Sequence, residues 1–156
     1  MAKRPNQRLK LLYLAKIMLR LTDDEHGLQV EQIINELAKY DIAAERKSIY
    51  SDLEALQLFG IDIEKKHIGR YVYYCVGNRN LELAELKLLV DAVQSSKFIT
   101  EKKSSQLIEK LERYVSRYEA KQLNQQVYVH GRIKTMNESI YYNCLLYTSD
   151  AADEAR

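Results

Sequence analysis

Residues 43–76 read AAERKSIYSDLEALQLFGIDIEKKHIGRYVYYCV, and this stretch decides the fold that the sequence predicts. Apolar residues recur in its first half at helical spacing, within about 60° of arc at about 100° per residue: Ile49, Leu53 and Leu56. Cationic and hydroxyl side chains fall on a separate arc of about 140°: Arg46, Lys47, Tyr50 and Ser51. We therefore expect a helix over residues 44–59 with one buried face and one cationic, hydrogen-bonding face.

The second half of this stretch predicts a hairpin of two short strands. Gly60 follows the helix, at a position where glycine is the common C-terminal cap. Residues 61–66 alternate between apolar and polar, as a half-buried strand does. Residues 67–69 are expected to turn, and residues 70–76 to return as the second strand. Basic residues gather where the turn is expected: Lys65, Lys66, His67 and Arg70.

Helices are expected on both sides of this unit. Upstream, apolar residues at helical spacing predict helices over 9–21 and 29–40, and the connection of residues 41–44 has the length of a helix-turn-helix bend. Downstream, a further helix is expected over 83–93. A turn at 98–100 then leads to another helix that runs to residue 118. The predicted class is mainly α with a small antiparallel β-wing.

A cationic helix followed by a basic hairpin is typical of a winged helix-turn-helix, which reads duplex DNA in the major groove. Arg46 and Lys47 could contact guanine or a phosphate, and Ser48, Tyr50 and Ser51 could donate hydrogen bonds to DNA. Lys65, Lys66, His67 and Arg70 would contact the backbone or the minor groove. Simpler readings exist: the cations as solvated surface charges, Tyr50 as a half-buried spacer and Ser48 as a local helix-end hydrogen bonder. For Asp52 we expect a structural ion pair.

Composition neither favours nor excludes nucleic acid as a partner. Residues 1–80 hold 13 Lys and Arg against 11 Asp and Glu, and the remainder holds 11 against 11. Affinity for phosphate would then depend on where the basic residues lie and not on their sum.

Sequence features of an enzyme or a metal site are missing. The three histidines and two cysteines have neither metal-ligand nor disulfide spacing, and the five glycines form no phosphate-binding loop. We expect no catalysis, no metal and no cofactor. The sequence holds no apolar run of about 18 residues and no signal peptide, so a cytoplasmic protein is expected.

Two segments carry a resemblance to bacterial WYL-domain transcriptional regulators. The first is LLYLAKIMLRLTDDEHGLQVEQIINELAKYDIAAERKSIYSDLEALQLFGIDI, with the family's basic pair, Ser-Ile-Tyr and Asp-Leu pattern at residues 46–53 and a leucine at 56. The second is QVYVHGRIKTMNESIYYN, which resembles the start of the family's effector-binding half at Arg132, Lys134 and Asn137. The resemblance covers residues 8–143. The Trp-Tyr-Leu motif itself is missing, because the chain has no tryptophan.

The resemblance implies four segments and a set of partners. These are a winged helix-turn-helix over 1–80, a helical linker and dimerisation segment over 81–122, the start of a truncated β-rich effector domain over 123–143, and a non-native tail over 144–156. The tail, CLLYTSDAADEAR, resembles a translated sequencing adapter. The expected partners are double-stranded DNA, a second copy of the chain in a homodimer, and a small-molecule or nucleic-acid effector bound by the missing domain, with no membrane.

Two other functions stay open. The unit could be a winged-helix module for protein interaction or dimerisation that does not bind DNA, which the near-neutral charge favours. It could also precede an enzyme, as similar winged helices do in biotin ligases.

Overall fold

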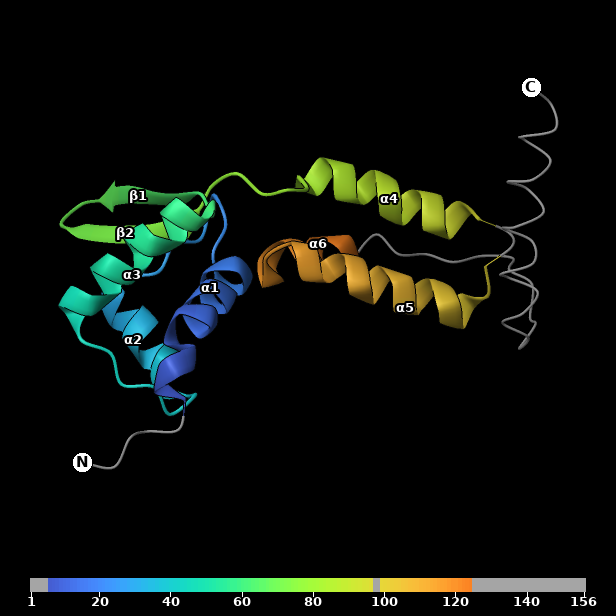
Figure 1. The fold of residues 1–156 in the computed structure, drawn as a ribbon. Coiled ribbons are helices and arrows are strands. Elements are labelled where there is room, and N and C mark those ends of the chain that lie inside the picture. The colour runs from blue at the N-terminus through green and yellow to red at the C-terminus, as the bar shows by residue number, and fades with distance from the viewer. Residues whose placement is uncertain (1–5, 97–98, 125–156) are drawn as a thin grey trace, which may run out of the picture.

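The computed structural model describes residues 6–96 and 99–124, and in this part the chain is mainly helical with one two-stranded antiparallel sheet (Figure 1). This confirms the prediction of a mainly helical chain with a small antiparallel sheet. The elements in chain order are the 3-10 helix η1 Gln7–Leu9, α1 Lys10–Leu21, α2 Val30–Ala38, α3 Arg46–Phe59, β1 Ile63–Ile68, β2 Tyr71–Val76, α4 Leu83–Ser95, α5 Glu101–Leu111, the 3-10 helix η2 Glu112–Tyr114 and α6 Arg117–Asn124.

The helices α1, α2 and α3 and the hairpin share one hydrophobic core. The three residues that predicted the inner face of α3, Ile49, Leu53 and Leu56, are all buried in it, which confirms that prediction. Burial of apolar side chains contributes roughly 1.5–3 kcal/mol for each large residue. Helix spacing therefore determines which side of α3 faces the protein and which side remains free.

Local signals mark the start of α2 and the end of α3. Gln29 and Gln32 form a reciprocal capping box at the start of α2. Gly60 ends α3 with a φ of 105°, in the left-handed region where a side chain is disfavoured. Each predicted helix of this unit is present, with ends that differ by one or two residues.

The hairpin turn lies one to two residues later than the sequence predicted. β1 and β2 pair in register from Ile63 opposite Val76 to Ile68 opposite Tyr71, which leaves Gly69 and Arg70 as a two-residue turn. Gly69 has a φ of 62°, as the first position of a tight hairpin turn can require. His67 is therefore a strand residue, paired with Val72, and not part of the turn.

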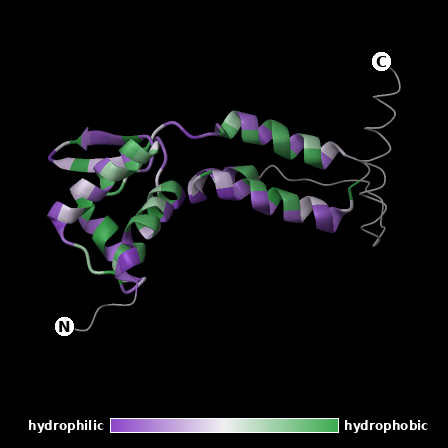
Figure 2. Cartoon of the chain, in the orientation of Figure 1, coloured by the Kyte–Doolittle hydropathy of each residue, from purple (hydrophilic) through white to green (hydrophobic). Residues whose placement is uncertain are grey.

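β1 is hydrophilic along most of its length (Figure 2), whereas β2 is covered at its carboxyl end by the rest of the protein. The free edge of β2 is continued by an isolated bridge in which the backbones of Leu28 and Tyr74 exchange two hydrogen bonds, at 2.9 and 2.8 Å. The segment before α2 is thus attached directly to the hairpin.

A second helical group follows the hairpin, and α4 and α5 lie side by side (Figure 1). Its own small core is formed by Leu86, Val115 and Leu123. The sequence predicted one helix that runs to residue 118, and this prediction is wrong about where the helix ends. It stops at Leu111 and is followed by η2, and α6 starts only at Arg117 because Ser116 caps a new helix.

From residue 125 onward, the predicted effector-domain start and the predicted tail lie outside the described residues. In the described part, none of the helices has the length and apolar character that crossing a bilayer requires.

Candidate nucleic-acid interface

The outer side of α3 presents four exposed side chains that the sequence singled out: Arg46, Lys47, Tyr50 and Ser51. We call these four residues the cationic face of α3. It is available to a partner because the opposite side of the same helix is buried in the core. Lys47 has no ion-pair partner in the described part of the chain.

Arg46, in contrast, pairs with Glu31 of α2 at 2.5 Å. Both side chains are more than 60% exposed (62% and 65%), so the pair is solvated. Exposed pairs of this kind contribute only about 0–1 kcal/mol. A phosphate or a base could therefore displace Glu31 from Arg46 at a small cost in free energy.

Ser48 differs from its neighbours, because its hydroxyl is already engaged within the protein. Lys10 of α1 donates to Ser48 Oγ at 2.6 Å, and Ser48 Oγ donates to the Glu45 carbonyl at 3.0 Å. The same Lys10 ammonium lies 2.5 Å from an Asp52 carboxylate oxygen. The expected structural ion pair of Asp52 is thus present, and Ser48 has the local role that was its simpler reading.

Lys10 of α1 therefore links α1 to α3 through Asp52 and Ser48. Its side chain is 13% exposed, and that of Asp52 is 24% exposed. A partly buried pair is less screened by salt than a surface pair. No sequence pattern singled out Lys10, since its partners lie 38 positions away or more.

Tyr50 and Lys65 meet at the boundary between α3 and the hairpin. They line a hollow of about 270 Å³ together with Leu53, Glu54, Gln57, Ile63 and Tyr74. The Lys65 ammonium lies 5.9 Å from the centre of the Tyr74 ring, within the range of a cation–π contact. The centres of the Tyr50 and Tyr74 rings are 6.3 Å apart. Tyr50 is 41% exposed, so it is both a spacer and an accessible donor.

The four basic residues predicted at the hairpin tip do not form one cluster. Side chains alternate between the two faces of a strand, so Lys65 and His67 share one face of β1 and Lys66 lies on the other. Arg70 lies in the turn.

The ammonium group of Lys66 is engaged in contacts within the protein. It donates to the Asp24 carbonyl at 2.7 Å and lies 3.8 Å from the Asp24 carboxylate and 3.6 Å from that of Glu64. Desolvation opposes its charged form, but attraction to Cys75, Asp24 and Glu64 outweighs this and raises the pKa of Lys66. Lys66 ties the hairpin to the loop after α1.

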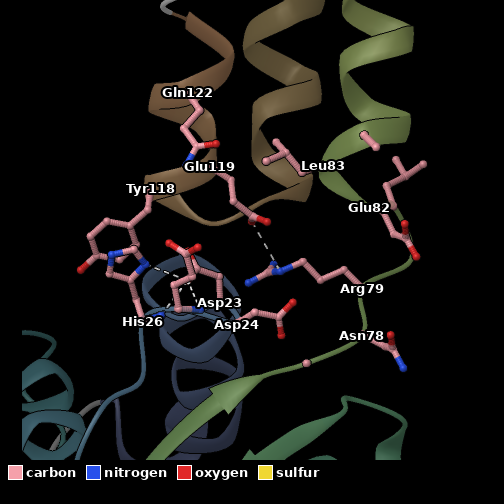
Figure 3. A pocket seen from close by; sticks show the side chains of 14 residues that line it. Asp23, Asp24, His26, Asn78, Arg79, Glu82, Leu83, Tyr118, Glu119 and Gln122 are labelled. Atoms are coloured by element: carbon pink, nitrogen blue, oxygen red, sulfur yellow. Dashed lines mark hydrogen bonds and ion pairs between the residues drawn. The ribbon is translucent and has the colours of Figure 1, made fainter.

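A second hollow, of about 480 Å³, lies where the hairpin unit, formed by α1 to α3 with β1 and β2, meets the downstream helices (Figure 3). Asp23 is at its centre: Ser116 Oγ donates to one carboxylate oxygen at 2.6 Å, and His26 Nδ1 lies 2.8 Å from the other. The His26 ring stacks on Tyr118 of α6, with centres 3.8 Å apart and planes 4° apart. We call Asp23, His26, Ser116 and Tyr118 the junction cluster.

The charge of Asp23 is stabilised by these contacts. Burial disfavours the carboxylate, but the hydrogen bonds from Ser116, from His26 and from backbone N–H groups outweigh burial and lower the pKa of Asp23. Next to it, Arg79 donates to the carbonyls of Leu19 and Thr22 at the end of α1 and lies 3.8 Å from Glu119 (Figure 3).

The described residues contain no group of three or more His, Cys, Asp or Glu side chains that could hold a metal ion. Comparison with known proteins adds no relative: no protein-family model matches the chain, and neither a curated protein nor a solved structure matches it.

Proposed function

We propose that the chain is the DNA-binding part of a bacterial WYL-type transcriptional regulator. In this proposal α2 and α3 form the helix-turn-helix, α3 is the recognition helix, and β1 with β2 forms the wing. The observation that supports it most is the cationic face of α3, which is exposed, backed by a buried core and adjacent to Lys65 on the hairpin.

The proposed mechanism is insertion of α3 into the major groove. The first turn of α3 holds Arg46 and Lys47, where a recognition helix directs its base-contacting end. Either side chain could bind guanine O6 and N7 or a phosphate. Tyr50 and Ser51, one turn later, would donate hydrogen bonds. Lys65, His67 and Arg70 would contact the adjacent backbone or minor groove, and Lys66 would act indirectly by holding the hairpin.

Further parts of the proposal concern the whole regulator. Reading paired half-sites requires two copies, so we propose a homodimer assembled through the helical linker and the effector domain. The effector would be a small molecule or a nucleic acid. We propose no catalytic activity and no cofactor, and a cytoplasmic location.

The test is a salt titration of binding to a mixed-sequence DNA duplex by the full chain and by the double variant Arg46→Ala/Lys47→Ala. The slope of log K against log salt is negative, and its magnitude should be smaller by about 1.8 in the variant, since each neutralised phosphate contributes about 0.9. The matched control is Lys102→Ala/Lys110→Ala, which removes the same charge from exposed positions on α5. Equal slopes for the two double variants would contradict the proposal.

The second candidate is a protein-interaction module that does not bind DNA. Two large apolar side chains at the end of α3 favour it: Leu58 is 91% exposed and Phe59 is 82% exposed. Isolated exposed apolar residues are common, but two together next to a hollow lined by Phe59 and Tyr114 form a patch. Salt-insensitive self-association without retention of DNA at low salt would establish this candidate and remove the first.

A further inference from the structure

A carboxylate, that of Glu54, continues the cationic face of α3 toward the end of the helix. Lys47, Tyr50, Ser51 and Glu54 are spaced i, i+3, i+4 and i+7, and all four are exposed. Residues at this spacing form one stripe along a helix. Homeodomains use two turns of their recognition helix at the same spacing to read bases. Glu54 is thus in the position of a fourth reading residue, with the opposite charge to Lys47.

Two acidic residues beside the cationic face of α3 are paired within the protein. Glu31 pairs with Arg46, and Asp52 pairs with Lys10. Glu54 makes no ion pair within the described residues, although it lines the same hollow as Tyr50 and Lys65. An unpaired surface glutamate is ordinary in itself. Its place at the end of a stripe proposed to approach a polyanion is what requires a reason.

The reason lies in the chemistry of the major groove. A carboxylate there is repelled by the phosphates on every sequence, so it weakens binding to all DNA alike. Only a hydrogen-bond donor on a base edge offsets this repulsion. Among single contacts, the N4 amino group of cytosine is the donor that suits an ionised carboxylate.

We propose that Glu54 is a specificity-determining residue that accepts a hydrogen bond from the N4 amino group of one cytosine in the operator. This inference rests on the proposed function and names the base that one position of that site would select. Discrimination against other bases at this position is expected to be on the order of tenfold. Glu54 would lower affinity for non-specific DNA and thereby increase the contrast between operator and background.

The experiment is selection from a pool of randomised duplexes at low salt, with the full chain, the variants Glu54→Gln and Glu54→Ala, and Glu101→Gln as control. Glu101 is also exposed, on α5, so its change removes the same charge away from α3. The unchanged chain and the control should both select cytosine at one position. Glu54→Gln should select adenine there, because glutamine can pair with adenine N6 and N7. Glu54→Ala should accept any base at that position and bind non-specific DNA more tightly.

Two failures are distinguishable. If every protein retains duplexes and all four select the same base at each position, Glu54 does not determine specificity and the inference is overturned while the proposed function stands. If the unchanged chain retains no duplex at low salt, the proposed function fails and the inference fails with it. Circular dichroism of each variant before selection shows that an altered preference does not come from unfolding.

Discussion

Ser116 holds together the junction between the hairpin unit and the downstream helices, and its replacement by alanine should be costly. Its hydroxyl donates to the buried Asp23 carboxylate at 2.6 Å and accepts from the backbone N–H groups of Tyr118 and Glu119 at 3.2 and 3.1 Å. It is therefore both the partner of a buried charge and the N-cap of α6. Both functions disappear in Ser116→Ala.

The size of the effect follows from those two losses. Removal of a serine N-cap costs about 1 kcal/mol, and loss of a hydrogen bond to a charged group costs about 1.5–3 kcal/mol. Ser116 itself is fully buried, so water cannot replace the hydroxyl without rearrangement. We expect Ser116→Ala to lower the free energy of unfolding by about 2–4 kcal/mol.

The assay is urea denaturation followed by far-ultraviolet circular dichroism and tyrosine fluorescence. Ser105→Ala is the matched control, because Ser105 is exposed and its hydroxyl only donates to the Glu101 carbonyl one turn earlier. The control should change stability by less than about 0.5 kcal/mol. The double variant Asp23→Asn/Ser116→Ala should cost less than the sum of its two single changes, since both act on one contact. A Ser116→Ala variant as stable as the Ser105→Ala control would refute the reasoning.

Four further outcomes are expected. Lys10→Met should cost about 1–3 kcal/mol in urea denaturation, because Asp52 loses its ion-pair partner and Ser48 loses a hydrogen-bond donor. Gly60→Ala should cost about 1–2 kcal/mol in the same assay, through its left-handed backbone alone, because no atom lies within 4 Å of the added carbon. Folding lowers the pKa of Asp23, so the stabilisation by the Asp23 carboxylate is complete above the ordinary pKa of 3.8 and is lost as pH falls through the pKa of the folded state. The difference in unfolding free energy between the unchanged chain and Asp23→Asn should therefore be smaller at pH 3 than at pH 7. Burial raises the pKa of the Cys75 thiol, so in a Cys144→Ser variant a thiol reagent should label Cys75 only as fast as the chain unfolds.

Sequence periodicity was sufficient to place α3, because the contacts that form a helix are local. Ile49, Leu53 and Leu56 could be assigned to the core from their spacing alone. The same locality explains the error at the hairpin. Alternation in residues 61–66 shows that a strand exists but does not fix its register or its end, so the turn was predicted at residues 67–69 although it is formed by Gly69 and Arg70.

The junction cluster could not be predicted in the same way. Asp23 and Ser116 are 93 positions apart, and no periodic pattern connects them. One signal was present: Ser116 and Glu119 have the spacing of a capping box, and in the structure the Glu119 carboxylate accepts from the Ser116 N–H at 2.9 Å. That spacing would have placed the start of α6 correctly. It would not have revealed that the capping hydroxyl also binds Asp23.

The separation of the two hydrophobic clusters has a consequence for synthesis of the chain. The first cluster is complete once Val76 has been made, whereas Ser116 follows about 40 residues later, a delay of about 2–8 s at about 5–20 residues per second. Helical units with mostly local contacts fold in microseconds to milliseconds. The helix–hairpin unit can therefore fold as soon as it has emerged from the ribosome, before α6 docks on it. During that interval Asp23 and Arg79 lie on an open surface, and docking of the downstream helices becomes a separate, later step of folding.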